Sequence, residues 1–261
     1  MFVSCSILGG VRSDSDSELF LVDQITTLYR VKHSGYDCVE LYYQPHPDWV
    51  KDTILSALED LELAAYSIHL PKFLFEYEED DFHASVYQCL GLADEAEVEV
   101  AVLHPPNEDD LKGERWRDYL DKLIEACDES DCSLTLEIVP YLTNVHEFIR
   151  DQIEFYEESD LGVTIDLEFM HVQGLRIESL MDLFGDRVSN IHFRDSDGSL
   201  LDQEGRRKYL VPGSGEIDLK HVIQVLKIND YEGAITVEVS HKKRKDIVTA
   251  KQYLDYLLSI V

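Results

Sequence analysis

The chain has 261 residues and a formal net charge of −30, because 53 residues are Asp or Glu and only 23 are Lys or Arg. A polyanion is repelled by nucleic acid and by anionic membranes, so the composition argues against nonspecific binding to either. The length suits one large core, and a hydrophobic content of 44% is ordinary for a globular protein. The acidic excess indicates a solvating surface, suited to high intracellular salt.

The cysteines give no sign of a disulfide framework. There are five, an odd number, and none has the C-x-x-C spacing of a thiolate zinc site. The amino-terminal segment lacks the basic start and apolar core of a signal peptide, and no apolar run approaches about 18 residues. We therefore expect a soluble, cytoplasmic protein with free thiols.

Apolar strand-like runs alternate with stretches of helical periodicity along the whole chain. The runs lie near residues 2 to 7, 37 to 42, 65 to 70, 97 to 104, 133 to 139, 162 to 167, 188 to 193 and 234 to 239. The helical stretches cover residues 18 to 32, 47 to 63, 81 to 92, 109 to 127, 145 to 158, 177 to 184, 219 to 228 and 247 to 260. Gly35 is placed to terminate the first helix.

The order of these elements predicts the fold. No two strands are joined by a two-residue turn signal, which favours a parallel sheet. Eight strand–helix units in a chain of 261 residues favour closure into a barrel over an open sheet. No linker-like or low-complexity tract divides the chain. We predict an α/β fold, a (β/α)8 TIM barrel, formed as a single domain over residues 1 to 261.

Polar side chains end most of the predicted strands at the same point. They are Glu40, His69, His104, Glu137, Asp166, His192 and Glu238. The residue two positions earlier points the same way in a strand, and in five of the runs it is small and polar. These residues are Ser67, Thr135, Thr164, Asn190 and Thr236. Because the carboxyl ends of barrel strands form the active-site mouth, we expect the terminal polar groups to converge there.

Four of these terminal groups predict a metal site. They are Glu137, Asp166, His192 and Glu238. Three carboxylates and an imidazole brought close together repel one another unless a cation neutralises them. Oxygen-rich ligation with one nitrogen suits Mg²⁺, Mn²⁺, Co²⁺ or Zn²⁺, so we expect one divalent ion. The alternative is that each residue is an individually satisfied polar group at the end of a strand.

The remaining terminal groups are candidates for substrate binding. His69 and His104 contact substrate or ligate a second metal in one interpretation, and are hydrogen-bonded structural residues in the other. Glu40 either contacts substrate or orients other site residues through a hydrogen bond. His171, five residues beyond Asp166, either reaches the same site or begins the next helix.

The scarce cations gather late in the chain. Ten of the 23 Lys and Arg residues fall between positions 194 and 245. Because the loops after strands seven and eight commonly bind phosphate in such barrels, this clustering predicts an anionic substrate, such as a sugar phosphate or sugar acid. The residues expected to contact it are Arg194, Asp195, Arg206 and Arg207. The alternative is that the basic runs balance an acidic surface or begin the last helix.

The strand motifs resemble those of the xylose isomerase-like barrel superfamily, which holds sugar isomerases, sugar epimerases and apurinic endonucleases. Each motif is short, but eight occur in the right order over nearly the whole chain. They are Gly35-Tyr-Asp-Cys-Val-Glu40-Leu, Ile68-His69-Leu-Pro71, Leu103-His104-Pro105, Leu136-Glu137, Ile165-Asp166, Ile191-His192-Phe-Arg-Asp195, Pro212-Gly-Ser-Gly-Glu-Ile-Asp218 and Ile235-Thr-Val-Glu238.

The resemblance implies that the four predicted ligands hold one divalent metal. In the epimerase branch it further implies that Glu137 and Glu238 act as acid and base on opposite sides of a sugar carbon. The metal would polarise a carbonyl and its neighbouring hydroxyl and lower the barrier to an enediolate. The endonuclease branch implies three zinc ions, with His69 and His104 at matching positions.

Two departures weigh against the endonuclease branch. The family places a histidine three residues after the strand-six aspartate, where this chain has Phe169. The Asp-x-His that endonucleases carry before the Gly-x-Gly loop is here Arg207-Lys-Tyr209. We therefore favour a metal-dependent isomerase or epimerase acting on a sugar, sugar phosphate or related polyol, alone or as an oligomer. The alternatives are a metal-dependent phosphodiesterase of the apurinic endonuclease type and a barrel that binds a ligand without turnover.

Overall fold

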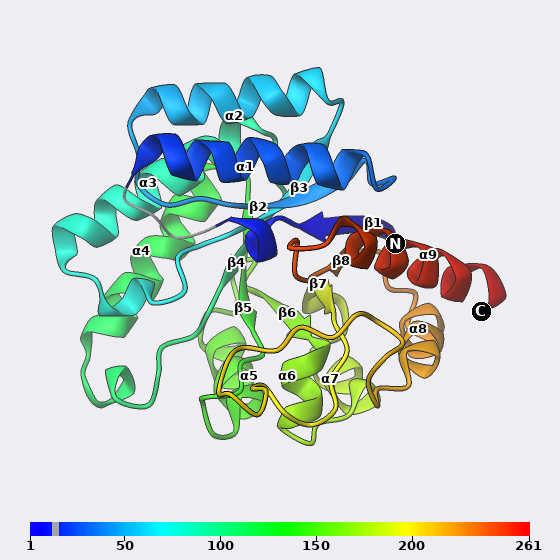
Figure 1. The fold of residues 1–261 in the computed structure, drawn as a ribbon. Helices are drawn as coiled ribbons and strands as arrows, with labels where there is room; N and C mark the ends of the chain where they lie inside the picture. Colours follow the sequence, from blue (N-terminus) through cyan, green and yellow to red (C-terminus); the bar gives the residue numbers. More distant parts are fainter. Residues whose placement is uncertain (12–15) are drawn as a thin grey trace.

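The computed structural model describes residues 1–11 and 16–261. Parallel strands pair in chain order and the last pairs with the first, so the sheet is a closed barrel surrounded by helices (Figure 1). The strands are β1 (Phe2–Ser6), β2 (Cys38–Tyr42), β3 (Ala64–His69), β4 (Val100–Leu103), β5 (Ser133–Glu137), β6 (Gly162–Asp166), β7 (Val188–Phe193) and β8 (Ala234–Val237). The predicted TIM barrel is confirmed.

Helices α1 to α8 lie between successive strands and α9 follows the last strand, as the sequence pattern predicts. They are α1 (Ser17–Lys32), α2 (Asp48–Asp60), α3 (Glu79–Glu95), α4 (Arg115–Glu129), α5 (Val145–Phe155), α6 (Leu167–Val172), α7 (Ile177–Phe184), α8 (Leu219–Ile228) and α9 (Arg244–Ile260). Gly35, past the end of α1, adopts a φ of 90°, a left-handed conformation that glycine tolerates best. The predicted helix terminator is therefore confirmed.

Two local features differ from the sequence expectations. The helix expected over residues 109 to 127 is split into a 3-10 turn (Asp110–Lys112) and α4, because the backbone of Gly113 is extended between them. The short helix α6 was not expected. It begins directly after β6 because the Asp166 side chain caps it, accepting a hydrogen bond from the Phe169 backbone N–H at 2.8 Å.

The apolar face of the strands packs outward under the helices. Its side chains are at most 3% exposed and include Leu134, Leu136, Val163, Ile165, Ile191 and Ile235. Burying a side chain of this size contributes roughly 1.5 to 3 kcal/mol to folding. This layer holds the strands in one register, so that Asp166 lies beside His192 and Glu137 beside Thr164.

The inward face of the barrel carries a hydrogen-bonded polar network beside a small apolar cluster that includes Val100 and Val102. Thr236 Oγ1 donates to Asn190 Oδ1 at 2.7 Å, and Asn190 Nδ2 donates to Glu40 Oε2 at 3.0 Å. Ser67 Oγ donates to the same Glu40 oxygen at 2.9 Å. Buried polar groups cost free energy unless they are paired. This network therefore holds in place the layer of side chains directly beneath the strand-end residues.

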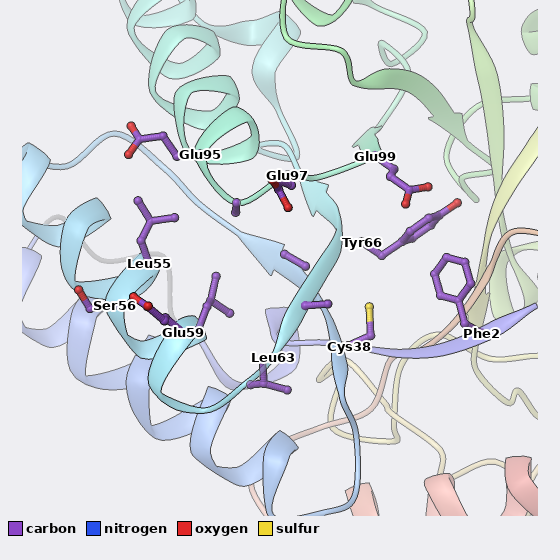
Figure 2. Close-up of a pocket in the computed structure, with 14 residues that line it drawn as sticks. Phe2, Cys38, Leu55, Ser56, Glu59, Leu63, Tyr66, Glu95, Glu97 and Glu99 are labelled. Carbon is purple, nitrogen blue, oxygen red and sulfur yellow. The ribbon is translucent and has the colours of Figure 1, made fainter.

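The amino-terminal end of the barrel is hollowed, away from the strand-end residues. A cavity of about 710 Å³ lies between the starts of β2 to β4 and the ends of α2 and α3 (Figure 2). A second cavity, of about 780 Å³, also borders Phe2, Tyr66 and Glu99. None of the predicted site residues lines either cavity, so the expected chemistry belongs to the opposite end. No described helix is long and apolar enough to cross a membrane.

Candidate metal centre

The four predicted ligands meet at the carboxyl end of the barrel. Glu137 and Asp166 are the last residues of β5 and β6. His192 is the penultimate residue of β7, and Glu238 directly follows β8. Each is at most 3% exposed. Strand register alone explains the convergence, because parallel strands in a closed barrel bring their carboxyl ends to one rim.

The spacing of their donor atoms fits a single divalent ion. His192 Nδ1 lies 3.1 Å from Glu137 Oε1, 3.5 Å from Glu238 Oε2 and 3.9 Å from Asp166 Oδ2. Ligands about 2.1 Å from a common ion are separated from one another by roughly 3 to 4 Å. Glu137, Asp166 and His192 each offer a ligand atom within 4.8 Å of the others. Three of the four predicted ligands therefore form a candidate metal centre by geometry as well as by residue type. Glu238 lies outside this group of three but has its Oε2 atom 3.5 Å from His192 Nδ1.

Glu40 fixes the orientation of the His192 ring. Its Oε2 atom lies 3.0 Å from His192 Nε2, on the side of the ring away from Glu137. A proton on Nε2 that is donated to Glu40 leaves the Nδ1 lone pair free for a metal. Although burial alone lowers it, the carboxylates of Glu40 and Glu137 raise the pKa of His192 well above its usual value. This hydrogen bond is the one that the orienting role expected for Glu40 requires.

Arg194 supplies the cationic charge nearest the centre. It stands two residues beyond His192, so both side chains point into the mouth. Arg194 Nη1 donates to Asp166 Oδ2 at 2.9 Å and to Glu238 Oε1 at 3.2 Å. Its guanidinium is buried, and its pKa is raised because Asp166 and Glu238 outweigh the effect of burial.

The carboxylates nevertheless outnumber this cation. Burial, opposed by Arg194 and reinforced by Glu137, raises the pKa of Asp166 to about 7. Burial also acts on Glu238, but Arg194 and His192 outweigh it and lower the pKa of Glu238 to about 2. A divalent cation would therefore stabilise the ionised form of Asp166, which is the form that can ligate a metal.

A second group of potential ligands shares Glu137. His104 Nε2 lies 2.8 Å from Glu137 Oε2, and His69 Nε2 lies 3.3 Å from the same oxygen. The His69 ring is oriented by its Nδ1 atom, which lies 2.7 Å from the Leu70 carbonyl oxygen. These three residues also offer ligand atoms within 4.8 Å of one another. The two expected histidines therefore join the site, on the side of Glu137 opposite His192.

Glu168 is a buried charged residue of the site that sequence reasoning missed. It lies on the unexpected helix α6, is 2% exposed, and its Oε2 is 2.6 Å from Arg194 Nη2. Glu168 also accepts a hydrogen bond from Arg207 Nη1 at 2.8 Å. The one signal in the sequence that Glu168 belongs to the site was its position two residues after Asp166. A glutamate at such a position ordinarily lies in the first turn of a helix and faces solvent.

The loop residues expected to bind substrate separate into two groups. Arg207 approaches the site through its ion pair with Glu168. Arg206 does not: its side chain is 72% exposed and pairs with Asp202 and Glu204. Asp195 is turned toward its own loop, where Oδ2 accepts hydrogen bonds from the backbone N–H groups of Gly213 and Gly215, both at 2.8 Å.

His171 stays apart from the four strand-end ligands. It is partly buried on α6 and makes no hydrogen bond or ion pair to the cluster among the described residues. Of the two interpretations given above, the structure places it on the helix that follows Asp166.

The positions that depart from the endonuclease pattern lie together. The Arg207 guanidinium carbon is 5.7 Å from the centre of the Phe169 ring and 5.0 Å from that of Tyr209. Arg194 lies against the same two rings, at 5.1 and 5.3 Å. Cationic side chains held on aromatic faces thus fill the region where the endonuclease branch would place extra metal ligands. This cluster offers guanidinium groups, which cannot ligate a cation.

This chain is a closed parallel barrel with a buried cluster of carboxylates and an imidazole at the carboxyl ends of its strands. It is therefore a TIM barrel with a candidate metal centre. Within that class, the model of the xylose isomerase-like TIM barrel family matches residues 28–259. The chain belongs to this family.

Curated relatives and solved structures resemble the chain at low sequence identity. Fructoselysine 3-epimerase of Escherichia coli O157:H7 is 28% identical over 141 residues, which cover 52% of this chain and 48% of that protein. Inosose isomerase of Halalkalibacterium halodurans is 24% identical over 226 residues, 79% of each chain. The chain spans about half the length of several curated relatives that it matches.

Among solved structures, the IOLI protein with a bound zinc atom is similar, with a TM-score of 0.74 and 19% identity, over 100% of this chain and 99% of that one. At such identity the likeness shows the fold.

Proposed function

We propose that this protein is a divalent-metal-dependent isomerase or epimerase that acts on a sugar, sugar phosphate or related polyol by proton transfer. The observation that carries the proposal is the group of Glu137, Asp166 and His192, whose donor atoms lie within 4.8 Å of one another, with Glu238 Oε2 3.5 Å from His192 Nδ1. The names of the relatives, which include epimerases and an isomerase of sugars or inosose, support the same substrate class.

The four cluster residues would hold the ion, which would supply Lewis-acid polarisation of a carbonyl and its neighbouring hydroxyl. The side chains would perform the proton transfers. Glu238 is ionised near neutrality because its pKa is lowered to about 2, so it can accept a proton from a substrate carbon. His104 and His192 lower the pKa of Glu137 well below its usual value, against the effect of burial. We assign the second proton transfer to Glu137 because it is the other glutamate of the cluster, as the resemblance of the strand motifs implies.

Arg194 and Glu40 would support this chemistry from either side. Arg194 holds Asp166 and Glu238 in place through Nη1 and offers positive charge to a developing oxyanion. Glu40 holds the His192 ring through the hydrogen bond between its Oε2 atom and His192 Nε2. The deep burial of all four cluster residues strengthens the electrostatic interactions among them.

A solvent-exchange experiment tests the proposal. The protein loaded with Mn²⁺ would be incubated in D₂O with a panel of ketoses, sugar phosphates and inositol derivatives, and carbon-bound deuterium measured by mass spectrometry. We expect exchange with at least one compound, and a loss of roughly 100-fold or more in Glu238→Gln. Absence of exchange across the panel, or full activity in Glu238→Gln, would contradict the proposal.

The endonuclease alternative keeps one supporting observation, the potential ligand group of His69, His104 and Glu137. Against it stand the Phe169, Arg207 and Tyr209 cluster and the net charge of −30. Cleavage of DNA containing an abasic site would favour this alternative. Ligand binding without exchange or cleavage would favour a non-catalytic barrel.

A further inference from the structure

A cavity of about 240 Å³ lies at the mouth of the barrel, beside the candidate metal centre. The loops that follow β3, β4 and β5 line it. Most of the lining is aromatic or prolyl, and includes Phe73, Phe75, Pro105, Pro106 and Tyr141. None of the four strand-end ligands contributes to this lining. The cavity is therefore a separate compartment with a different chemical character from the polar centre.

Hydrogen bonds join the loops that form the walls of this cavity. The Tyr141 hydroxyl donates to the Pro105 carbonyl oxygen at 2.9 Å, which joins the loops after β4 and β5. Asn107 Nδ2 donates to Glu76 Oε1 at 3.1 Å, which joins the loops after β3 and β4. A site fastened in this way loses little conformational entropy when it is occupied.

The cavity nevertheless leaves apolar surface in contact with water. The Phe73 side chain is 59% exposed and Tyr141 is 38% exposed. Exposed aromatic rings that line a concave site beside polar groups are typical of ligand-binding pockets. Covering these rings would gain free energy in proportion to the apolar area removed from water.

The cavity adjoins the metal centre through two residues. The Tyr141 ring lies 6.1 Å from the ring of His104, whose Nε2 is 2.8 Å from Glu137 Oε2. Lys72 lines the cavity three residues after His69, and its charge also acts on Glu238. The cavity therefore lies one side chain away from the centre, within reach of a substituent on a sugar held there.

We propose that this cavity binds an apolar, ring-sized substituent of the substrate, so that the preferred substrate is a sugar bearing an aryl or comparable apolar ring. A dry cavity of about 150 Å³ accommodates benzene, so about 240 Å³ holds one six-membered ring. Aromatic side chains stack favourably on such a ring. This inference rests on the proposed function for the sugar part and on the cavity alone for the ring.

A binding experiment tests the ring site independently of catalysis. The probe is 4-fluorobenzyl alcohol, titrated into the metal-free protein and followed by ¹⁹F NMR. We expect saturable binding, weakened about 5- to 10-fold in Phe73→Ala, because roughly 50 Å² of apolar contact is worth nearly tenfold in affinity. Phe155→Ala is the matched control, since Phe155 is 75% exposed on α5, outside the cavity lining. Non-saturable binding, or equal affinity in Phe73→Ala, would overturn the inference.

The same variants separate this inference from the proposed function. With the Mn²⁺-loaded protein, deuterium exchange would be compared for fructose and 1-anilino-1-deoxyfructose. We expect kcat/KM to be about tenfold higher for the anilino compound, with most of that preference lost in Phe73→Ala. Exchange without a ring preference would overturn the cavity assignment while the proposed function stood. Probe binding that depends on Phe73, without exchange on any sugar, would support the ring site and contradict the proposed function.

Discussion

Glu40 is a buried carboxylate that lies behind the candidate metal centre and orients one of its residues. Its Oε2 accepts hydrogen bonds from Ser67 and Asn190 and faces His192 Nε2. Burial raises its pKa, but the charge and hydrogen bonding of His192 outweigh burial and lower it. The carboxylate is therefore ionised, and it presents a fixed acceptor to the far side of the histidine ring. Outer groups of this kind set ring orientation and ligand basicity.

We predict that Glu40→Gln weakens divalent metal binding by about 10- to 100-fold, because an amide orients the His192 ring less firmly and does not stabilise its Nε2 proton electrostatically. Competition with a chromogenic chelator would measure the affinity for Mn²⁺ or Zn²⁺. Glu99→Gln is the control, because Glu99 lies at the amino-terminal end of the barrel. Equal metal affinity in Glu40→Gln and the parent protein would show that Glu40 does not position the ligand.

At the scale of elements, the strand ends were the most predictable part of the structure. Strand period fixes which residues share a face, and parallel pairing brings Glu137, Asp166 and His192 to one rim. Local sequence gives no comparable signal for the contacts of loops. Arg206 and Arg207 are adjacent and chemically alike, yet Arg206 pairs with Asp202 and Glu204 of its own loop and Arg207 reaches Glu168.

The helix α6 illustrates a second limit of the sequence pattern. It has only six residues, too few to show a helical period, and its start depends on Asp166 acting as a cap as well as a candidate ligand. Without α6 the place of Glu168 could not be foreseen. The contact between Arg194 and Glu168 therefore became visible only in the structure.

Asp195 accepts most of the backbone hydrogen bonds that close the start of the loop between β7 and α8 onto its end. Asp195 accepts backbone hydrogen bonds from Ser196, Gly213, Gly215 and Ile217. A Cβ atom at Gly215 would lie 2.2 Å from Asp195 Oδ1, so the close approach of the loop requires glycine there. The Pro-Gly-Ser-Gly motif is thus explained by the path of the loop.

We predict that Asp195→Ala destabilises the protein by roughly 1 to 3 kcal/mol, since one buried and three partly buried backbone donors lose their acceptor. Chemical denaturation would measure the change, and limited proteolysis should cut within residues 197 to 212 faster than in the parent protein. Asp197→Ala, which removes an exposed carboxylate paired with Lys208, is the control and should leave stability unchanged. Unaltered stability and proteolysis in Asp195→Ala would contradict the role given to this residue.

At the scale of the whole molecule, the dominant feature is the net charge of −30. Many exposed carboxylates have few cations to pair with, so the folded chain experiences net self-repulsion. Salt screens this repulsion, and the screening length falls to about 3 Å at 1 M.

We therefore predict that the midpoint of thermal unfolding rises by several degrees between about 0.1 and 1 M KCl, following from a gain of order 1 kcal/mol or more. Differential scanning calorimetry would follow the midpoint. Sucrose at matched osmolality separates screening from general solute exclusion, because sucrose carries no charge. A midpoint that is independent of KCl, or that rises equally with sucrose, would show that charge repulsion does not limit stability.

The central claim is that four strand-end residues hold one divalent ion. Anomalous diffraction at the manganese edge, from crystals grown with MnCl₂, tests it most directly. We predict an anomalous peak bonded to Glu137, Asp166, His192 and Glu238, and a loss of that peak in Glu238→Gln crystals. Diffraction that showed no ion among these four side chains at saturating Mn²⁺ would contradict the account.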